Sequence, residues 1–505
     1  MHGTEHRRRR HKREVALEGA LDGNAALVAV PVEATAEDDS SPTPASERPE
    51  ANDTCIMQVP AQAEGTTREL LALAWPIAAA MLGETALGLV DTKLVGGLGS
   101  AALGGVGMGI TLMYLGYALL FGVMRGVKVR SAHAVGSGRR RDGVVYAKAG
   151  VLLGASGGVL IFAVTRDASP LLYALGADAE IVPYARDFLA AVTFGAPAAG
   201  ALSALIQHRQ GVGDSRTPMV VGLAGNAFNA ALAWALIYGR LGLPKLGVRG
   251  GGYATALTLV LDLAVLLWLL TKEERRAGAL PDESPPLSLR RATREVVELG
   301  LPTGAQFAAE TLAFTAFTAL LGGAGKAQIA AHQIGLAVIR TSFLPGAAIA
   351  EAASVMVGRS LGARRLDAAD RAAKSAVLVA VAFMASCGVV FAVFGGALAR
   401  VFTSDADVVA IAKKLLLLAA AFQVLDAVNI VYRGALRGAK DVRVAALVGS
   451  AVVWLFIPTS ALVLGRWMGW GALGGWVGFV GETTVGALVL WLRWTRGGWR
   501  RAYAS

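Results

Sequence analysis

Long apolar runs recur along almost the whole chain, and they restrict its fold more than any other feature. Each run holds about 20 residues or more, which as an α-helix is enough to cross a hydrocarbon core about 30 Å thick. None shows the alternation of a membrane barrel, and backbone groups in lipid need partners within the segment. The sequence therefore predicts an all-α membrane protein with twelve transmembrane helices, at about 70–95, 102–134, 144–165, 184–207, 218–240, 250–271, 297–321, 327–357, 374–400, 407–432, 444–465 and 472–493.

The first 65 residues differ from this pattern. They combine the basic run MHGTEHRRRRHKR with a stretch rich in acidic residues, Pro and Ser, and this composition buries too little apolar surface to fold. Glu14, Glu18 and Asp22 interrupt the apolar stretch that a signal peptide needs after its basic start. We expect residues 1–65 to form a disordered cytoplasmic tail that is not cleaved.

Loop charges predict the orientation in the membrane. With the N-terminus inside, the inner segments hold 24 Lys and Arg residues and the outer loops hold seven. This asymmetry is what the positive-inside rule predicts for two cytoplasmic termini. The net charge of +11 then reflects topology rather than nucleic-acid binding. The expected location is the bacterial cytoplasmic (inner) membrane, as a monomer, and the two cysteines provide no disulfide framework.

The chain contains an internal duplication. A shift of 226 residues aligns residues 73–105 with residues 299–331 without a gap, and 11 of the 33 positions are identical. Each copy holds six predicted spans, so both copies enter the membrane from the same side, and transporters are often built from such repeats. The predicted parts are two pseudo-symmetric six-helix lobes at 66–271 and 297–505, the second with a short basic tail, joined by a cytoplasmic linker at 272–296.

Several short motifs follow one another in a fixed order from residue 70 to about residue 480. They include GLVDTKLVGGLGSAALGGVG, GVGDSRTPMVVGLAGNAFN, LGVRGGGYATAL, AAHQI, EAASVMVGRSLGARR and LRGAKD. The ordered set resembles the multidrug and toxic compound extrusion (MATE) family, and FAAETLAF and FQVLDAVNIV are similar to its NorM-type bacterial branch. The resemblance implies a coupling-cation site at Glu310 and Asp426, as possible Na⁺ ligands. It also implies contributions from Asp91 and Asn229, and Gln333 of the AAHQI motif joins the candidate site.

Carboxylates inside the predicted spans point to the same site independently. A charged side chain at the bilayer centre costs at least about 2.5–3.5 kcal/mol, so an intramembrane acid usually faces a cavity and has a function. Glu84 and Asp91 are seven residues apart, which places them on one face of the first helix. For Asp262, Glu351 and Glu482, a hydrogen-bonded or water-facing position between helices is the favoured interpretation.

Basic residues within the spans need a separate explanation. Arg125, Lys128 and Arg130 lie near the inner end of the second span, where we expect their side chains to snorkel to the membrane surface. Arg340 lies about 13 residues into the eighth span, too deep to do so. It either pairs with a carboxylate or lines the cavity, where it would replace part of a coupling cation or favour an anionic substrate.

Enzymatic motifs find no support. GASGG at 154–158 fits a hydrolase pattern, but it lies within a span whose glycines recur every four residues, as in helix packing. GGAGKA lacks the residues of a phosphate-binding loop. The sequence thus predicts no enzyme and no cofactor beyond a coupling ion.

The predicted function is secondary active efflux, in which drug-like or organic cations are exchanged for Na⁺ or H⁺ by alternating access. The expected partners are a small-molecule substrate and the lipid bilayer. Three alternatives stay open: an exporter of organic anions, a lipid-linked precursor flippase of the same superfamily, and a membrane enzyme or receptor.

Overall fold

The computed structural model describes residues 67–174, 178–278 and 285–503, which are helical apart from their connections. The predicted tail at 1–65 lies outside these residues. In the first half, the short helix η1 (Thr193–Gly195) joins α6 to α7, so that both form one span. The helices of this half are α2 (Thr67–Gly96), α3 (Ser100–Gly136), α4 (Arg140–Thr165), α5 (Ser169–Ala174), α6 (Val182–Val192), α7 (Ala196–Gly211), α8 (Arg216–Tyr238) and α9 (Val248–Gly278).

The second half repeats this arrangement. The π-helical turn η2 (Ala461–Trp467) continues α14 from Ser460. Pro458, near the end of α14, lacks the backbone N–H of a regular helix. The helices are α10 (Leu289–Gly322), α11 (Lys326–Gly362), α12 (Leu366–Arg400), α13 (Ala406–Gly438), α14 (Val442–Ser460), α15 (Gly471–Thr495) and the terminal η3 (Gly498–Tyr503).

The all-α, twelve-span prediction is confirmed. Among the described residues, eleven helical segments are long and apolar enough to cross a membrane. The one predicted span that is not among these eleven lies at 297–321 and corresponds to α10. This helix has 34 residues but is more polar, because its middle contains Gln306, Glu310 and several threonines. We expect a helix of this polarity to face other helices or water rather than lipid.

Several helices extend beyond the predicted spans into the charged loops. α9 continues to Gly278 and α10 begins at Leu289, so helix occupies much of the range 272–296 assigned to the linker. α13 runs on to Gly438, six residues past its predicted end. Arg, Lys, Glu and Ala favour helix, so a helix need not stop where its apolar run stops.

The duplication is visible in the backbone as well as in the sequence. Gly99 and Gly325 are 226 residues apart, and each precedes a long helix with a positive φ, of 114° and 107°. Pro76 and Pro302 lie inside the equivalent helices α2 and α10. The two halves therefore share turns and helix interruptions, as expected of copies of one six-helix unit.

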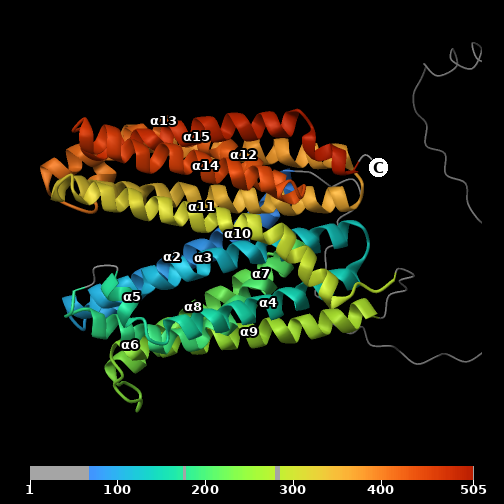
Figure 1. Ribbon diagram of the computed structural model, residues 1–505, viewed down its shortest axis with the longest axis horizontal. Coiled ribbons are helices and arrows are strands. Elements are labelled where there is room, and N and C mark those ends of the chain that lie inside the picture. The colour runs from blue at the N-terminus through green and yellow to red at the C-terminus, as the bar shows by residue number, and fades with distance from the viewer. Residues whose placement is uncertain (1–66, 175–177, 279–284, 504–505) are drawn as a thin grey trace, which may run out of the picture. The chain divides into compact units, whose positions relative to one another are not determined.

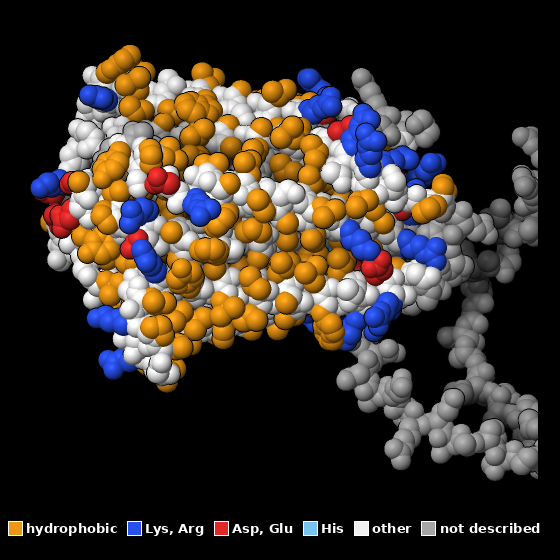
Figure 2. Space-filling view, turned by 60° about the horizontal axis from the view of Figure 1, so that its bottom comes forward, with side chains coloured by type: hydrophobic (Ala, Val, Ile, Leu, Met, Phe, Trp, Pro, Cys, Tyr) orange, Lys and Arg blue, Asp and Glu red, His pale blue; other side chains and the backbone are white. Residues whose placement is uncertain are grey.

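The two halves form two lobes that lie side by side. In Figure 1, the yellow-to-red helices α11–α15 lie on one side and the blue-to-green helices α2–α9 on the other, with α10 between them. We call the end where α9 finishes and α10 starts the linker end. A second view shows a broad hydrophobic band on one face, with Lys and Arg side chains gathered towards the two ends (Figure 2). This distribution suits a bundle that crosses a bilayer.

The lobes pack closely at the linker end through glycines. On α3, Gly126 faces α10, and a Cβ atom there would lie 2.5 Å from the carbonyl oxygen of Val296, closer than a side chain tolerates. Gly122 packs in the same way against Gly304. Towards the other end the interface is looser, since Tyr114 touches Phe307 with ring centroids 6.4 Å apart yet remains 52% exposed. The structure is therefore closed between the lobes at the linker end.

We predict that Gly126→Ala disturbs this closure. The added methyl group would push α3 from α10, at a cost of roughly 1–3 kcal/mol. Gly107→Ala is the matched control, because nothing lies within 4 Å of a Cβ atom at that position of the same helix. Thermal unfolding in detergent, together with spin-label distances between Thr271 and Asp367, should show a loosened linker end for Gly126→Ala alone. Equal behaviour of the two variants would contradict the glycine seam.

Candidate functional site

Glu310 faces α13 from α10 and is held by two partners. Its Oε1 atom accepts hydrogen bonds from Arg433 Nη1 at 2.7 Å and from Gln306 Nε2 at 2.8 Å. The Glu310 and Arg433 side chains are only 17% and 16% exposed. The acid that stood out in the sequence is thus part of a half-buried ion pair within the second lobe.

Arg433 connects Glu310 to two further acids. Its Nη2 atom lies 3.2 Å from Asn429 Oδ1 and 3.5 Å from Glu482 Oε1, and Asn429 Nδ2 donates to the same Glu482 oxygen at 3.1 Å. Asp426 is buried on α13, seven residues before Arg433, and interacts electrostatically with both Arg433 and Glu482. The structure therefore brings Glu310 and Asp426 together around one arginine, with Glu482 as a third acid.

These four side chains have an excess of negative charge. We call Glu310, Asp426, Glu482 and Arg433 the carboxylate cluster; it holds three acids and one guanidinium. Burying an uncompensated carboxylate is costly, so such a group takes up a proton or attracts a cation. The cluster can therefore bind positive charge that arrives from outside the protein.

A second buried cluster has the opposite composition. Glu351 on α11 accepts contacts from Lys128 at 2.7 Å, Arg437 at 3.2 Å and Arg125 at 3.3 Å. Arg125 and Lys128 belong to α3 of the first lobe, whereas Glu351 and Arg437 belong to the second. This Glu351 cluster is a charged contact across the seam between the lobes, with three cations around one acid.

Two expectations about basic residues were wrong. Lys128 is 2% exposed and bound to Glu351, so it does not snorkel to the surface, and Arg125 contacts the same acid. Arg433 and Arg437 follow the predicted span 407–432, but both lie inside α13, because that helix continues past its apolar run. An arginine near the end of a span looks the same in the sequence in either case.

The two clusters adjoin on α13, where Arg433 and Arg437 are four residues, or about one turn, apart. Taken together they contain four acids and four cations. Two of the cations are supplied by the first lobe. The balance of buried charge in the second lobe consequently depends on contact between the lobes at the linker end.

The first-lobe candidates lie apart from these clusters. Asn229 is buried on α8 and donates from Nδ2 to Thr255 Oγ1 at 3.2 Å, while its Oδ1 atom has no partner among the described residues. Glu84 is exposed and Asp91 half-buried along α2. Neither acid forms an ion pair within the described part of the chain.

Arg340 is a cation of the second lobe that interacts with a residue of the first. Its side chain is exposed on α11, and no carboxylate of the described ranges pairs with it. Together with Arg125 and Glu84 it acts electrostatically on the hydroxyl of Tyr114, which belongs to α3 of the other lobe. Of the two possibilities for Arg340, pairing with a carboxylate is not seen among the described residues, and the cavity-lining role stays a prediction. Gln333, two turns earlier on α11, is exposed as well.

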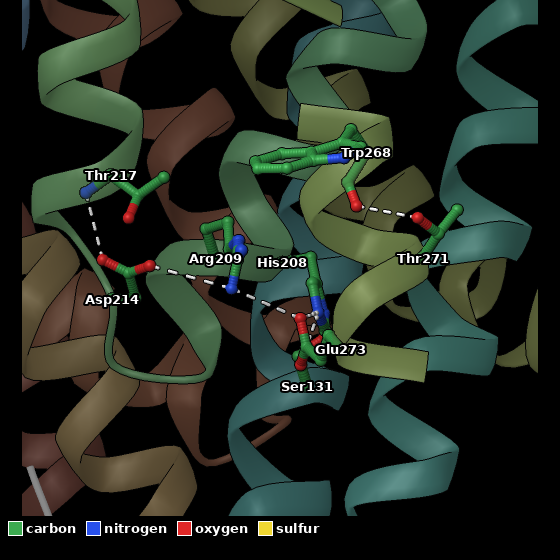
Figure 3. Close-up of polar contacts among 8 residues, drawn as sticks. All are labelled: Ser131, His208, Arg209, Asp214, Thr217, Trp268, Thr271 and Glu273. Carbon is green, nitrogen blue, oxygen red and sulfur yellow. Dashed lines mark hydrogen bonds and ion pairs between the residues drawn. The ribbon is translucent and has the colours of Figure 1, made fainter. Parts of the chain in front are cut away.

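A polar network at the linker end ties three helices of the first lobe together (Figure 3). His208 of α7 is hydrogen-bonded through Nδ1 to Ser131 of α3 at 2.8 Å and through Nε2 to Glu273 of α9. Arg209 contacts Glu273 at 3.4 Å and Asp214 at 3.7 Å. Because its members belong to one lobe and satisfy one another, this network supports the fold of that lobe.

The charge contact across the seam predicts a large effect of Glu351→Gln. Removing this acid leaves three neighbouring cations without a counter-charge, and breaking a buried ion pair costs about 3–5 kcal/mol. Glu274→Gln is the control, because Glu274 pairs with Lys148 at an exposed site where an ion pair contributes about 0–1 kcal/mol. The free energy of unfolding in detergent should fall much further for Glu351→Gln. Similar losses in both variants would contradict a structural role for the Glu351 cluster.

Comparison with known proteins places this geometry in context. The MatE family model matches residues 76–235 and 302–462, two segments that begin 226 residues apart, the offset of the internal repeat. The "Probable multidrug resistance protein NorM" of Burkholderia mallei is 34% identical over 434 residues, covering 83% of this chain and 90% of that protein. The "Multidrug resistance protein MdtK" of Proteus mirabilis is 27% identical over 84% of this chain and 93% of its own length.

Solved structures share the fold. A MOP superfamily transporter from Pyrococcus furiosus superposes with a TM-score of 0.77 at 21% identity, over 88% of this chain and 97% of that one. Its structure is described under the statement that the reverse polarity of its binding pocket suggests a different function. The Vibrio cholerae MATE transporter VcmN superposes with a TM-score of 0.78 at 19% identity, over 87% of this chain and 98% of its own.

Proposed function

The chain belongs to the MatE family of membrane transporters, and from that premise we propose that it exports organic, drug-like cations in exchange for an inward-moving cation. The observation that carries this proposal is the carboxylate cluster, where two buried acids and the half-buried Glu310 surround one arginine. A site with surplus negative charge binds either the coupling cation or a cationic substrate, and not both at once. By linkage, each then weakens the binding of the other.

The Glu351 cluster suggests how lobe movement would control this site. With the linker end closed, Arg125 and Lys128 contribute two positive charges to the buried groups of the second lobe. When the lobes part there, the second lobe keeps four acids and two arginines, and is left with two uncompensated negative charges. Cations from the compartment to which the site has just become accessible would bind there and compensate the two negative charges. Reclosure returns Arg125 and Lys128 and favours release of the bound cation on the other side.

The loop charges assign a direction to this cycle. Lys and Arg residues are concentrated in the segments at the linker end, and the positive-inside rule places such segments in the cytoplasm. We therefore propose that the structure represents the outward-open state, in a bacterial inner membrane with both termini inside. One elementary charge moving inward contributes about 2.3 kcal/mol per 100 mV of membrane potential.

Of the two coupling ions, the donor set suits a proton better than Na⁺. Within the described ranges, no group of three or more Asp, Glu, His or Cys side chains is placed to hold a metal ion. Sodium would thus need amide or backbone oxygens besides Glu310 and Asp426, whereas a proton needs one carboxylate oxygen. We propose proton exchange, with no other cofactor and with a monomer as the working unit.

Efflux from proteoliposomes tests the cation site. Glu310→Gln and Asp426→Asn should each reduce proton-gradient-driven efflux of a cationic dye by at least about tenfold, because each removes a carboxylate that would bind the coupling ion. Asp407→Asn, an exposed acid in the first turn of α13, should transport like the wild type. A sodium gradient in place of a proton gradient distinguishes the two ions. Unchanged drive in both site variants would reject the assignment.

An anionic substrate is the second candidate, and Arg340 is the observation that favours it. An arginine that is predicted to line the cavity would attract anions, and the Pyrococcus furiosus relative is described with a pocket of reverse polarity. Cation export predicts that Arg340→Ala keeps or increases dye efflux, since a repulsive charge is removed. Anion export predicts loss of organic-anion efflux in Arg340→Ala but not in Arg400→Ala. Arg400 is exposed at the end of the bundle opposite the linker end. Measuring the efflux of cationic dyes and of organic anions by each variant distinguishes the two candidate functions.

A further inference from the structure

A pocket with five basic side chains in its lining lies on the seam between the lobes at the linker end, apart from the proposed transport site. Its volume is about 300 Å³. The first lobe contributes the end of α3 and the start of α4, and the second lobe contributes the start of α10, the end of α11 and the turns after α11 and α13. The cations that line it are Arg130, Arg139, Arg291, Arg364 and Lys440.

The acids of this seam pocket are already engaged. Glu295 lies 3.1 Å from Arg130 and 3.0 Å from Arg291, and the Tyr146 hydroxyl donates to it at 2.5 Å. Asp142 is paired with Arg139. Arg364 and Lys440 are left over, and neither has a carboxylate at ion-pair distance among the described residues. The pocket thus combines an overall positive charge with two cations that are free to take a ligand.

The backbone at these two positions argues against accidental placement. Arg364 and Lys440 adopt φ values of 58° and 61°, in the left-handed region that favours glycine. At the equivalent turn of the first lobe, 226 residues before Arg364, the chain has Gly138 with a φ of 77°. A non-glycine residue in this conformation carries a cost of about 1 kcal/mol or more. The second lobe bears that cost twice and gains a cationic side chain in the pocket each time.

Lys440 also reflects the shortage of negative charge. Burial, followed by repulsion from Arg130, lowers the pKa of this lysine to about 8. A bound anion would relieve both effects, because it restores a counter-charge where water is partly excluded. The lysine is therefore poised to gain from an anionic ligand.

We propose that the seam pocket binds a phosphate group and that the bound phosphate holds the two lobes together at the linker end. Phosphate oxygens accept several hydrogen bonds at once, which suits guanidinium and ammonium donors converging from different helices. Two sources supply such a group: an anionic lipid headgroup, since basic pockets at the cytoplasmic side of membrane helices bind such headgroups, and a soluble phosphate. The donors and the site are the same for both sources.

The lobe arrangement gives the site a regulatory consequence. Arg130 and Arg139 move with the first lobe, whereas Arg291, Arg364 and Lys440 move with the second. A ligand that contacts both sets binds the closed linker end better than the open one, and so shifts the population towards closure. This coupling is independent of which substrate the transporter carries.

The test uses the full chain in phosphatidylcholine nanodiscs, with two arms. The first arm titrates inorganic phosphate against sodium chloride of equal ionic strength, and the second replaces part of the lipid by phosphatidylglycerol without added phosphate. The readouts are the midpoint of thermal unfolding and the distance between spin labels at Thr271 and Asp367, in a background with Cys55→Ser and Cys387→Ser. The variants are Lys440→Gln, Arg364→Gln and Lys440→Arg, with Arg443→Gln as an exposed cation outside the pocket.

The wild type should respond saturably in at least one arm, with a higher unfolding midpoint and a larger population of short label distances. Lys440→Gln and Arg364→Gln should weaken that response about tenfold, whereas Lys440→Arg and Arg443→Gln should keep it. A response to phosphate alone identifies a soluble ligand, and a response to phosphatidylglycerol alone identifies a headgroup. No saturable response in either arm, or equal loss in Arg443→Gln, overturns the proposal. Should Lys440→Gln fail to fold, the exposed Arg364→Gln decides. Neither readout requires transport, so the outcome is independent of the efflux assay.

Discussion

The contact of Glu351 with Lys128, Arg125 and Arg437 is the interaction on which the rest of the arrangement depends. It joins residues separated by 223 positions in the chain and closes the seam between the lobes at one end. Buried charges have strict requirements, because each needs a counter-charge of suitable geometry. A small number of groups, whose partners would change if the lobes moved, therefore stabilises the closed state. The apolar and glycine packing around them determines where the contact can form.

Packing and charge act at the same end of the molecule. Gly122 and Gly126 let α3 approach α10 closely, and this approach brings Arg125 and Lys128 within reach of Glu351. Close packing without the ion pairs would give little preference for the closed state over the open one. Ion pairs without close packing would remain exposed to water and contribute little stability. In the proposed cycle, their combination gives opening at the linker end an electrostatic consequence for Glu310 and Asp426.

The sequence predicted the fold well, and the site only in part. Apolar runs and the 226-residue repeat located the helices, because membrane length and backbone satisfaction leave few alternatives. Glu310 stood out as an acid within an apolar run. Its partner Arg433 did not, since an arginine near the end of a run is as common in a loop as inside a continuing helix. The pairing of Lys128 with Glu351 needs three-dimensional proximity that periodicity in one chain does not encode.

The two copies of the repeat differ at the positions that form the carboxylate cluster. Glu84 and Glu310 are equivalent, yet in the described ranges only Glu310 pairs with an arginine, and the register that aligns Gly211 with Gly438 places Ile206 opposite Arg433. An acid with a built-in companion responds chiefly to motion of the scaffold, whereas a solitary one responds to whatever diffuses past it. We infer that duplication followed by a few such changes lets the two copies respond differently, one to cations in solution and the other to movement of the lobes.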